Sequence, residues 1–173
     1  MATKSFDLDG YLDAIRRKDI EGVLNMYADD VVITDVNSDA ELRGKSALRT
    51  LMTNMKSALP DVDIDPVKVV RSNGSLAVLA HVRASYPKDF TAPGGATLAV
   101  GGKKLDTHAV FFVDVDDTGR IKHVHRFADL AAVSKQLGLD VEQLEEVRKQ
   151  VMASVRPKAE RPPPGEVMPP PAI

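Results

Sequence analysis

The pattern of hydrophobic residues changes from helical to alternating near residue 60. Before this point, apolar residues recur every three or four positions, which predicts amphipathic helices that each bury one side. After it, β-branched and aromatic residues alternate with polar ones, which predicts strands. Helices that precede a series of strands are typical of an α+β domain, with the helices packed on one face of an antiparallel sheet.

Two short helices, a strand and a third helix are predicted in the first part. The first helix follows Ser5, and its apolar stripe is Leu8, Tyr11, Leu12 and Ile15. Asp19 can cap a second helix, whose stripe is Ile20, Val23, Leu24 and Tyr27. The β-branched run 31–36 predicts a strand. After a polar loop containing Gly44, a third helix is predicted to end at Pro60, with its apolar residues at Leu48, Leu51, Met52, Met55 and Leu59.

Two hairpins follow. Asn73 and Gly74 favour a tight turn between predicted strands at 62–71 and 76–86. The turn residues 116–119 separate predicted strands at 107–115 and 120–127. The segment 87–102 contains Pro93-Gly94-Gly95 and is predicted as a long loop or an elongated hairpin end that could act as a lid.

Two helices are predicted near the C-terminus, and only the second of them is predicted to lie outside the main domain. Asp129 can cap a short helix that ends at Gly138, and a second helix runs from Asp140 to about Val155. The apolar stripe of this second helix is narrow, so we expect it to pack on a neighbour. The proline-rich residues 157–173 favour a disordered tail or a ligand for a proline-binding groove. The predicted units are therefore a domain at 1–139, a helix at 140–156 and a tail at 157–173.

Composition excludes several classes of function. A formal net charge of -2 gives no field that would attract nucleic acid, and the chain has no cysteine for a disulfide, a thiolate nucleophile or a cysteine-based zinc site. No apolar run reaches the length that spans a membrane, and the N-terminus lacks the apolar core of a signal peptide. We therefore expect a cytoplasmic protein that binds neither nucleic acid nor membrane and needs no cofactor.

Several phrases resemble the nuclear transport factor two-like superfamily, in particular its SnoaL-like polyketide cyclase and ketosteroid isomerase branches. The phrases are KDIEGVLNMYADDVVITDV, LRGKSALRTLM, DTGRIKHVHRFAD and SKQLGL. The resemblance implies a cone-shaped α+β barrel in which a curved antiparallel sheet packs on three N-terminal helices around an apolar pocket. It also implies a small hydrophobic ligand and a homodimer formed through the outer sheet face. The superfamily contains enzymes and binders, so the fold alone does not select a function.

Two candidate catalytic residues follow from this resemblance. Asp35 matches the general base of the isomerase branch, although an aspartate here could simply begin a polar turn. Tyr11 matches a tyrosine that donates a hydrogen bond to the developing oxyanion, although an aromatic residue on an amphipathic helix is more often core. Phe111 stands where the isomerase has its second, acidic donor, which argues against a true steroid isomerase.

Arg126 is the third candidate. Closing the second hairpin so that Val115 faces Arg120 places Ala109, Phe111, Val113, Val124 and Arg126 on one face. By the resemblance this face looks into the pocket, where an arginine would bind an acidic or carbonyl oxygen or pair with Asp35. The residues expected to contact substrate are Phe111, Val113, Val124, Tyr27 and Met55. In the epoxide hydrolase branch the place of Arg126 is an aspartate, so that activity is disfavoured.

The histidines fall on the other face. His108, His123 and His125 could converge on a metal or could form a histidine-rich dimer interface, and the second interpretation is preferred. His81 and His108 with Asp35 loosely match the residues of a dehydratase branch. Asp129 is expected to cap a helix, although a nearby acid transfers protons in cyclase-like members.

Three functions therefore compete. The first is an isomerase or cyclase that transfers protons on a small hydrophobic carbonyl compound, with Asp35, Tyr11 and Arg126 as its catalytic residues. The second is a non-catalytic ligand-binding or dimeric accessory domain. The third is a dehydratase.

Overall fold

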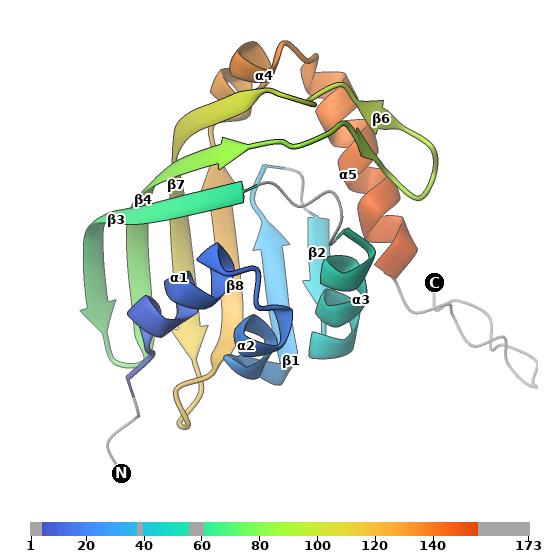
Figure 1. Cartoon of the computed structure of the whole chain (residues 1–173). Helices are drawn as coiled ribbons and strands as arrows, with labels where there is room; N and C mark the ends of the chain where they lie inside the picture. Colours follow the sequence, from blue (N-terminus) through green and yellow to red (C-terminus); the bar gives the residue numbers. More distant parts are fainter. Residues whose placement is uncertain (1–4, 38–39, 56–60, 156–173) are drawn as a thin grey trace, which may run out of the picture.

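The computed structural model describes residues 5–37, 40–55 and 61–155 (Figure 1). Its main element is a curved, six-stranded sheet of order β2-β1-β8-β7-β4-β3, in which only the β1–β8 pair is parallel. The strands are β1 (Tyr27–Asp35), β2 (Ala40–Arg43), β3 (Asp61–Ser72), β4 (Ser75–Ser85), β7 (Lys104–Val115) and β8 (Ile121–Ala128). This α+β architecture with a curved sheet confirms the predicted fold class. The predicted tail and the predicted helix end at Pro60 lie outside the described residues.

Three helices cover one face of the sheet, which we call the inner face (Figure 1). They are α1 (Leu8–Arg16), α2 (Ile20–Asn25) and α3 (Lys45–Met55). Asp7 and Asp19 cap the first two helices by accepting hydrogen bonds from Gly10 N and Gly22 N. The buried residues that these helices share with the sheet include Ala14, Leu24, Leu48, Val78 and Val124. None of the described helices combines the length and hydrophobicity needed to cross a membrane.

The two predicted hairpins are present, but one register was wrong. In the β7–β8 hairpin Val113 faces Val124, and Val115 faces Ile121 rather than Arg120. The register changes after Asp114, at a bulge that the pattern of turn residues does not reveal. Away from the bulge the error is two residues, which is one full period of a strand, so the predicted division of side chains between the two faces is still correct.

Three short strands were missed. β2 pairs with β1, and Leu42 is buried while Glu41 and Arg43 are not, so this short strand has too little hydrophobic pattern to stand out. The segment 87–102, which was predicted as a long loop or an elongated hairpin end, contains a small separate hairpin of β5 (Phe90–Thr91) and β6 (Thr97–Leu98). β1 also begins at Tyr27, four residues before the predicted start.

The C-terminal helices pack on the same chain. α4 (Leu130–Leu137) is capped by Asp129, which accepts from Ala132 N at 3.0 Å, and it ends at Gly138 with φ 57°. α5 (Val141–Val155) lies against β2, α3, α4 and β6 (Figure 1). Gln150 of α5 accepts a hydrogen bond from Ala96 N at 3.0 Å, which ties the helix to the small hairpin. The narrow stripe that was expected to pack on a neighbour therefore forms part of a second core of this chain.

Candidate functional site

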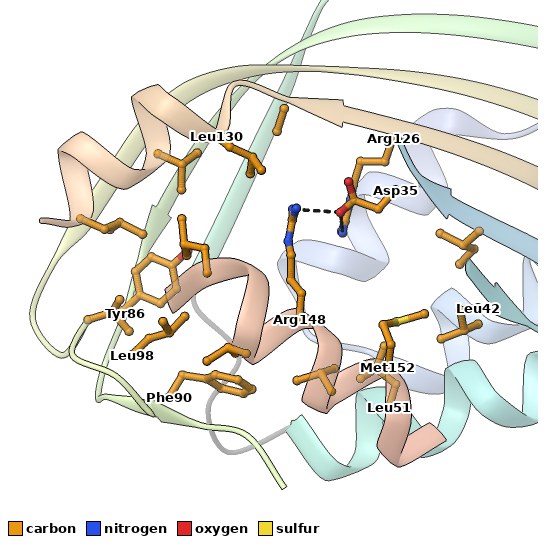
Figure 2. Close-up of a pocket in the computed structure, with 18 of the residues that line it drawn as sticks. Asp35, Leu42, Leu51, Tyr86, Phe90, Leu98, Arg126, Leu130, Arg148 and Met152 are labelled. Atoms are coloured by element: carbon orange, nitrogen blue, oxygen red, sulfur yellow. Dashed lines mark hydrogen bonds and ion pairs between the residues drawn. The ribbon is translucent and has the colours of Figure 1, made fainter. Parts of the chain in front are cut away.

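A cavity of about 450 Å³ lies between the sheet, α3, the β5–β6 hairpin and the C-terminal helices. A volume of this size is in the range of small-molecule sites. Figure 2 shows apolar side chains around most of it, with the charged groups together at one place. Its lining residues are Ile33, Asp35, Leu42, Leu48, Leu51, Tyr86, Phe90, Leu98, Val100, Arg126, Ala128, Leu130, Val133, Leu137, Leu144, Val147, Arg148, Val151 and Met152.

One aspartate and two arginines form the charged part of this cavity. Arg126 Nη2 lies 2.8 Å and Arg148 Nη2 lies 2.9 Å from the same oxygen, Oδ2 of Asp35 (Figure 2). The side chain of Asp35 is only 9% exposed, whereas that of Arg126 is 50% exposed. The carboxylate is therefore held inside the wall of the cavity, and Arg126 has the freedom to reach other partners.

The ends of β1 and β8 position the first ion pair. These strands run in parallel with Asp35 opposite Arg126, so both side chains leave the sheet on the inner face. The other carboxylate oxygen, Oδ1, accepts from Asn37 N at 3.1 Å, and the Asn37 side chain accepts from Ala128 N at 3.2 Å. This hydrogen bond to Asn37 N is the turn interaction considered for Asp35, and it coexists with the ion pairs.

Arg148 comes from α5 and was not predicted as a site residue. Its Nη1 atom is buried without a hydrogen-bond partner among the described residues. Burial lowers the pKa of Arg148 from its usual value, while the charge of Asp35 acts in the opposite direction. The sequence pattern could have pointed to Arg148 as an inward-facing residue. It falls four residues after Leu144 and three before Val151, within the apolar stripe of the helix.

Tyr11 lies away from the cavity. Its hydroxyl makes a 2.6 Å hydrogen bond with the hydroxyl of Tyr27, and the two rings meet edge to face. Burial raises the pKa of both tyrosines, most strongly for Tyr27, and the charge of Arg126 partly opposes this effect. The pair belongs to the core between α1 and the sheet, and neither residue is among those that line the cavity.

The remaining residues expected to contact substrate either lie in the core or have a side chain that the structure does not describe. Val113 and Val124 are buried under the N-terminal helices, and Phe111 packs against the same cluster. Large apolar side chains fill this part of the cone, so the open space lies at the other end, beneath α5 and the small hairpin. Met55 is the last residue of α3, and its side chain lies outside the described part of the structure.

The histidines lie on the outer face of the sheet. His81 and His108 stack with ring centroids 5.1 Å apart, and His81 Nε2 lies 2.6 Å from Asp106 Oδ1. Because Asp35 is on the inner face, the sheet separates it from the two histidines proposed for a dehydratase. His123 and His125 are neighbours, with centroids 4.5 Å apart. Within 5–37, 40–55 and 61–155, no group of three or more histidine, aspartate or glutamate side chains could hold a metal ion.

The chemistry available in the cavity is that of oxyanion binding and proton transfer. Guanidinium groups can stabilise a carboxylate or an enolate, and a carboxylate beside them can accept a proton. The hydroxyl of the partly buried Tyr86 adds a polar group in another part of the wall, and desolvation raises the pKa of this tyrosine.

Solved structures share this fold. The chain is similar to a candidate polyketide cyclase from Xanthomonas campestris pv. campestris, with a TM-score of 0.62, 21% identity, and coverage of 75% of this chain and 93% of that one. It is also similar to an LEH-like epoxide hydrolase from M. tuberculosis, with a TM-score of 0.59, 17% identity, and coverage of 87% and 93%. At sequence identities of 21% and 17%, the structural similarity shows a shared fold. A comparison with curated protein sequences finds no match.

The sequence profile of the SnoaL-like domain matches residues 8–124, which is more than half of the chain. The match covers the three N-terminal helices and most of the sheet, and it ends before α4 and α5. The chain therefore belongs to the SnoaL-like domain family, with two C-terminal helices that complete its cavity.

Proposed function

We propose that this protein catalyses proton transfer on a small hydrophobic carbonyl compound, as an isomerase or cyclase of the SnoaL-like type. The observation that carries the proposal is the meeting of Asp35, Arg126 and Arg148 in an otherwise largely apolar cavity. Apolar walls reduce competition from water, and both a base and an oxyanion donor are present.

In the proposed mechanism, substrate binding frees Asp35 from one of its two ion pairs so that it can act as the base. Without a ligand, both guanidinium groups donate to Oδ2 of Asp35, so this oxygen is poorly placed to accept a proton. A carbonyl oxygen that enters the cavity would draw Arg126 away, because this side chain is half exposed. Arg148 would keep Asp35 oriented, and a lone pair of Oδ2 would become available.

The chemical step then follows. Asp35 takes a proton from the carbon next to the carbonyl group, so that the C–H bond breaks and a carboxylic acid forms. The electron pair moves to the carbonyl oxygen, and Arg126 stabilises the resulting enolate. In a β,γ-unsaturated ketone, Asp35 returns the proton to the γ-carbon of the dienolate, which gives the conjugated isomer. In a compound with a second carbonyl group, the enolate carbon attacks that group and closes a ring, and the alkoxide that forms takes the proton back from Asp35. In this scheme Arg126 is the oxyanion donor, and Tyr11, which does not line the cavity, makes no contact with the substrate.

The proposal is tested by hydrogen–deuterium exchange at the α-carbon of 2-tetralone, an apolar ketone, followed by NMR in D₂O. We expect exchange above the buffer rate, with a loss of roughly 10²- to 10⁴-fold in Asp35→Asn, the usual range for a general base. Asp117→Asn, in an exposed turn, is the matched control and should retain the wild-type rate. Exchange that is equal in wild type and Asp35→Asn would remove Asp35 from the mechanism.

A non-catalytic binder is the second candidate. The observation that favours it is the double engagement of Asp35, since a carboxylate held by two arginines can serve as a structural counter-ion. In that case 2-tetralone bound in the cavity would exchange at the buffer rate, and Asp35→Asn would change affinity without changing exchange.

We further propose that the protein forms a homodimer through the outer face of the sheet. Phe112 is 56% exposed and Phe127 is 47% exposed, and both lie on this face beside His123 and His125. A sheet that is apolar on both sides needs two covers, and the helices provide only the inner one. The experiment is sedimentation velocity: the wild type should sediment as a dimer and Phe112→Glu as a monomer. A monomeric wild type would contradict this proposal.

A further inference from the structure

The charges in the cavity do not balance. Its charged lining residues are Asp35, Arg126 and Arg148, which give one negative and two positive charges. Glu145, one turn before Arg148 on α5, raises the pKa of Arg148 through its charge but does not line the cavity. A cationic group held in apolar surroundings is costly unless an anion compensates it, so the cavity is electrostatically suited to a monoanionic ligand.

Arg148 shows where the negative charge would bind. Its Nη2 atom is engaged by Asp35, whereas Nη1 is buried and makes no hydrogen bond within the described part of the chain. A buried donor of this kind carries a desolvation cost that an acceptor removes. A carboxylate oxygen is the acceptor that a guanidinium group binds best, because the hydrogen bond is charge-assisted.

The walls around Arg148 show what else the ligand must contain. In Figure 2, Arg148 lies between two sets of apolar side chains, one with Leu51 and Met152 and the other with Phe90 and Leu98. A fully hydrophilic acid would leave these walls uncovered, whereas a hydrocarbon chain would bury them.

We infer that the cavity selects apolar carboxylic acids, whose carboxylate pairs with the guanidinium group of Arg148 and whose hydrocarbon part lies along the walls; a rotation of the Arg148 side chain brings its covered Nη1 donor to the ligand. The inference rests on the proposed function in one respect, which is that the same cavity holds the substrate. Combined with the proposed mechanism, it specifies an apolar keto acid: the carboxylate binds Arg148 and the carbonyl group binds Arg126.

Arg148 is contributed by a helix that lies beyond the part of the chain matched by the family profile. The proposed selectivity therefore depends on a residue that lies outside the part of the chain matched by the family profile. Arg148 is a binding residue in this scheme, and it also positions Asp35.

The test is calorimetric titration of the full chain with octanoate and with octan-1-ol, which differ in charge and share their hydrocarbon length. We expect octanoate to bind at least about tenfold more tightly. Arg148→Gln should weaken octanoate by roughly 10- to 100-fold, in line with loss of a charged hydrogen bond, and should change octanol by less than about threefold. Lys149→Gln removes the same charge from the exposed neighbouring position and should leave both affinities unchanged.

Octanoate titrations of two further variants test the same inference. Asp35→Asn raises the net charge of the lining, so it should tighten octanoate binding even though it abolishes exchange of 2-tetralone. If Arg148→Gln does not fold, Arg148→Lys replaces it and should show a smaller loss, since lysine keeps the charge but lacks the planar pair of N–H groups with which a guanidinium group binds a carboxylate. Equal affinity for octanoate and octanol, or equal losses in the variants at positions 148 and 149, would overturn the inference.

The two proposals fail separately. Octanoate binding that depends on Arg148, together with exchange at the buffer rate for both 2-tetralone and 7-oxooctanoate, an apolar keto acid, would support acid selectivity and refute catalysis. Exchange that depends on Asp35, together with octanoate binding no tighter than octanol, would support catalysis and refute acid selectivity.

Discussion

Arg148 in the C-terminal helix places Nη2 2.9 Å from Oδ2 of Asp35 at the end of β1, so an ion pair in the wall of the cavity joins α5 to the sheet. The same oxygen is 2.8 Å from Arg126 Nη2, and the three groups are not equivalent. Asp35 is the common acceptor for two cations, whereas each arginine is one of two donors. This asymmetry predicts different consequences for removing each member.

We expect Asp35→Ala to lower the free energy of unfolding by about 2–4 kcal/mol, because it leaves two guanidinium groups without their counter-ion. Arg148→Met retains an unbranched apolar stem and leaves Asp35 paired with Arg126, so it should cost less than about 1 kcal/mol. Urea unfolding at neutral pH measures both values. Equal costs for the two variants would show that the aspartate is not the shared acceptor in solution.

The C-terminal helix should be necessary for the stability of the domain. Leu144 and Val147 belong to a buried cluster with residues of α4 and of the segment that follows β6, such as Leu137 and Val100. Ending the chain after Leu139 exposes this cluster, and the loss should reach several kcal/mol, since each large aliphatic side chain contributes roughly 1.5–3 kcal/mol on burial. Thermal unfolding and the binding of a fluorescent apolar dye measure the change.

A chain ending after Val155 is the control for this truncation, because it keeps every described contact of α5. It should unfold at the temperature of the full chain. A version ending after Leu139 that retains both the wild-type unfolding temperature and octanoate binding would show that α5 is an independent appendage.

The hydrogen bond between Tyr11 and Tyr27 should make the effects of these two residues on the free energy of unfolding non-additive. The hydroxyl groups are 2.6 Å apart and buried, so removing one leaves the other without this partner. We expect Tyr11→Phe and Tyr27→Phe each to cost about 1–3 kcal/mol, and the double variant to cost clearly less than the sum. Additive costs in urea unfolding would indicate that the two hydroxyl groups do not interact.

Asp116 should make the β7–β8 turn sensitive to acid. Its carboxylate accepts from the hydroxyl and the backbone N–H of Thr118 and from Arg120 N, and these bonds lower its pKa to about 2. A depressed pKa stabilises the folded state above the unfolded value of about 4, and this stabilisation is lost as the pH falls from about 4 toward 2.

The measurement is urea unfolding of wild type and Asp116→Asn at neutral pH and near pH 2. The variant should be less stable at neutral pH, and the difference should shrink in acid, where the wild-type carboxyl group is protonated. Asp117→Asn, at the adjacent exposed position, should show little difference at either pH. A difference for Asp116→Asn that does not depend on pH would contradict the assigned role of the carboxylate.

Much of the fold was predictable because it depends on local patterns. Asp19 and Asp129 cap the helices they were expected to cap, and Asn73 and Gly74 adopt the positive φ angles that the predicted turn requires. The faces of the β7–β8 hairpin were also correct, since they depend on strand alternation. Its register was wrong, because the bulge after Asp114 is a local irregularity that alternation does not encode.

Only part of the site was predictable, because some of its features follow from local pattern and others from packing between distant parts of the chain. Strand alternation was enough to group Arg126 with Phe111, Val113 and Val124 on one face, and the family resemblance supplied the expectation that this face and Asp35 lie at the pocket, as Arg126 and Asp35 do. The position of the cavity could be read only from the packed structure, since it depends on which large side chains fill the cone and how α5 packs across its open end. The meeting of Arg148 and Asp35 could likewise be read only from the structure, because contacts between residues so far apart in the chain arise from packing.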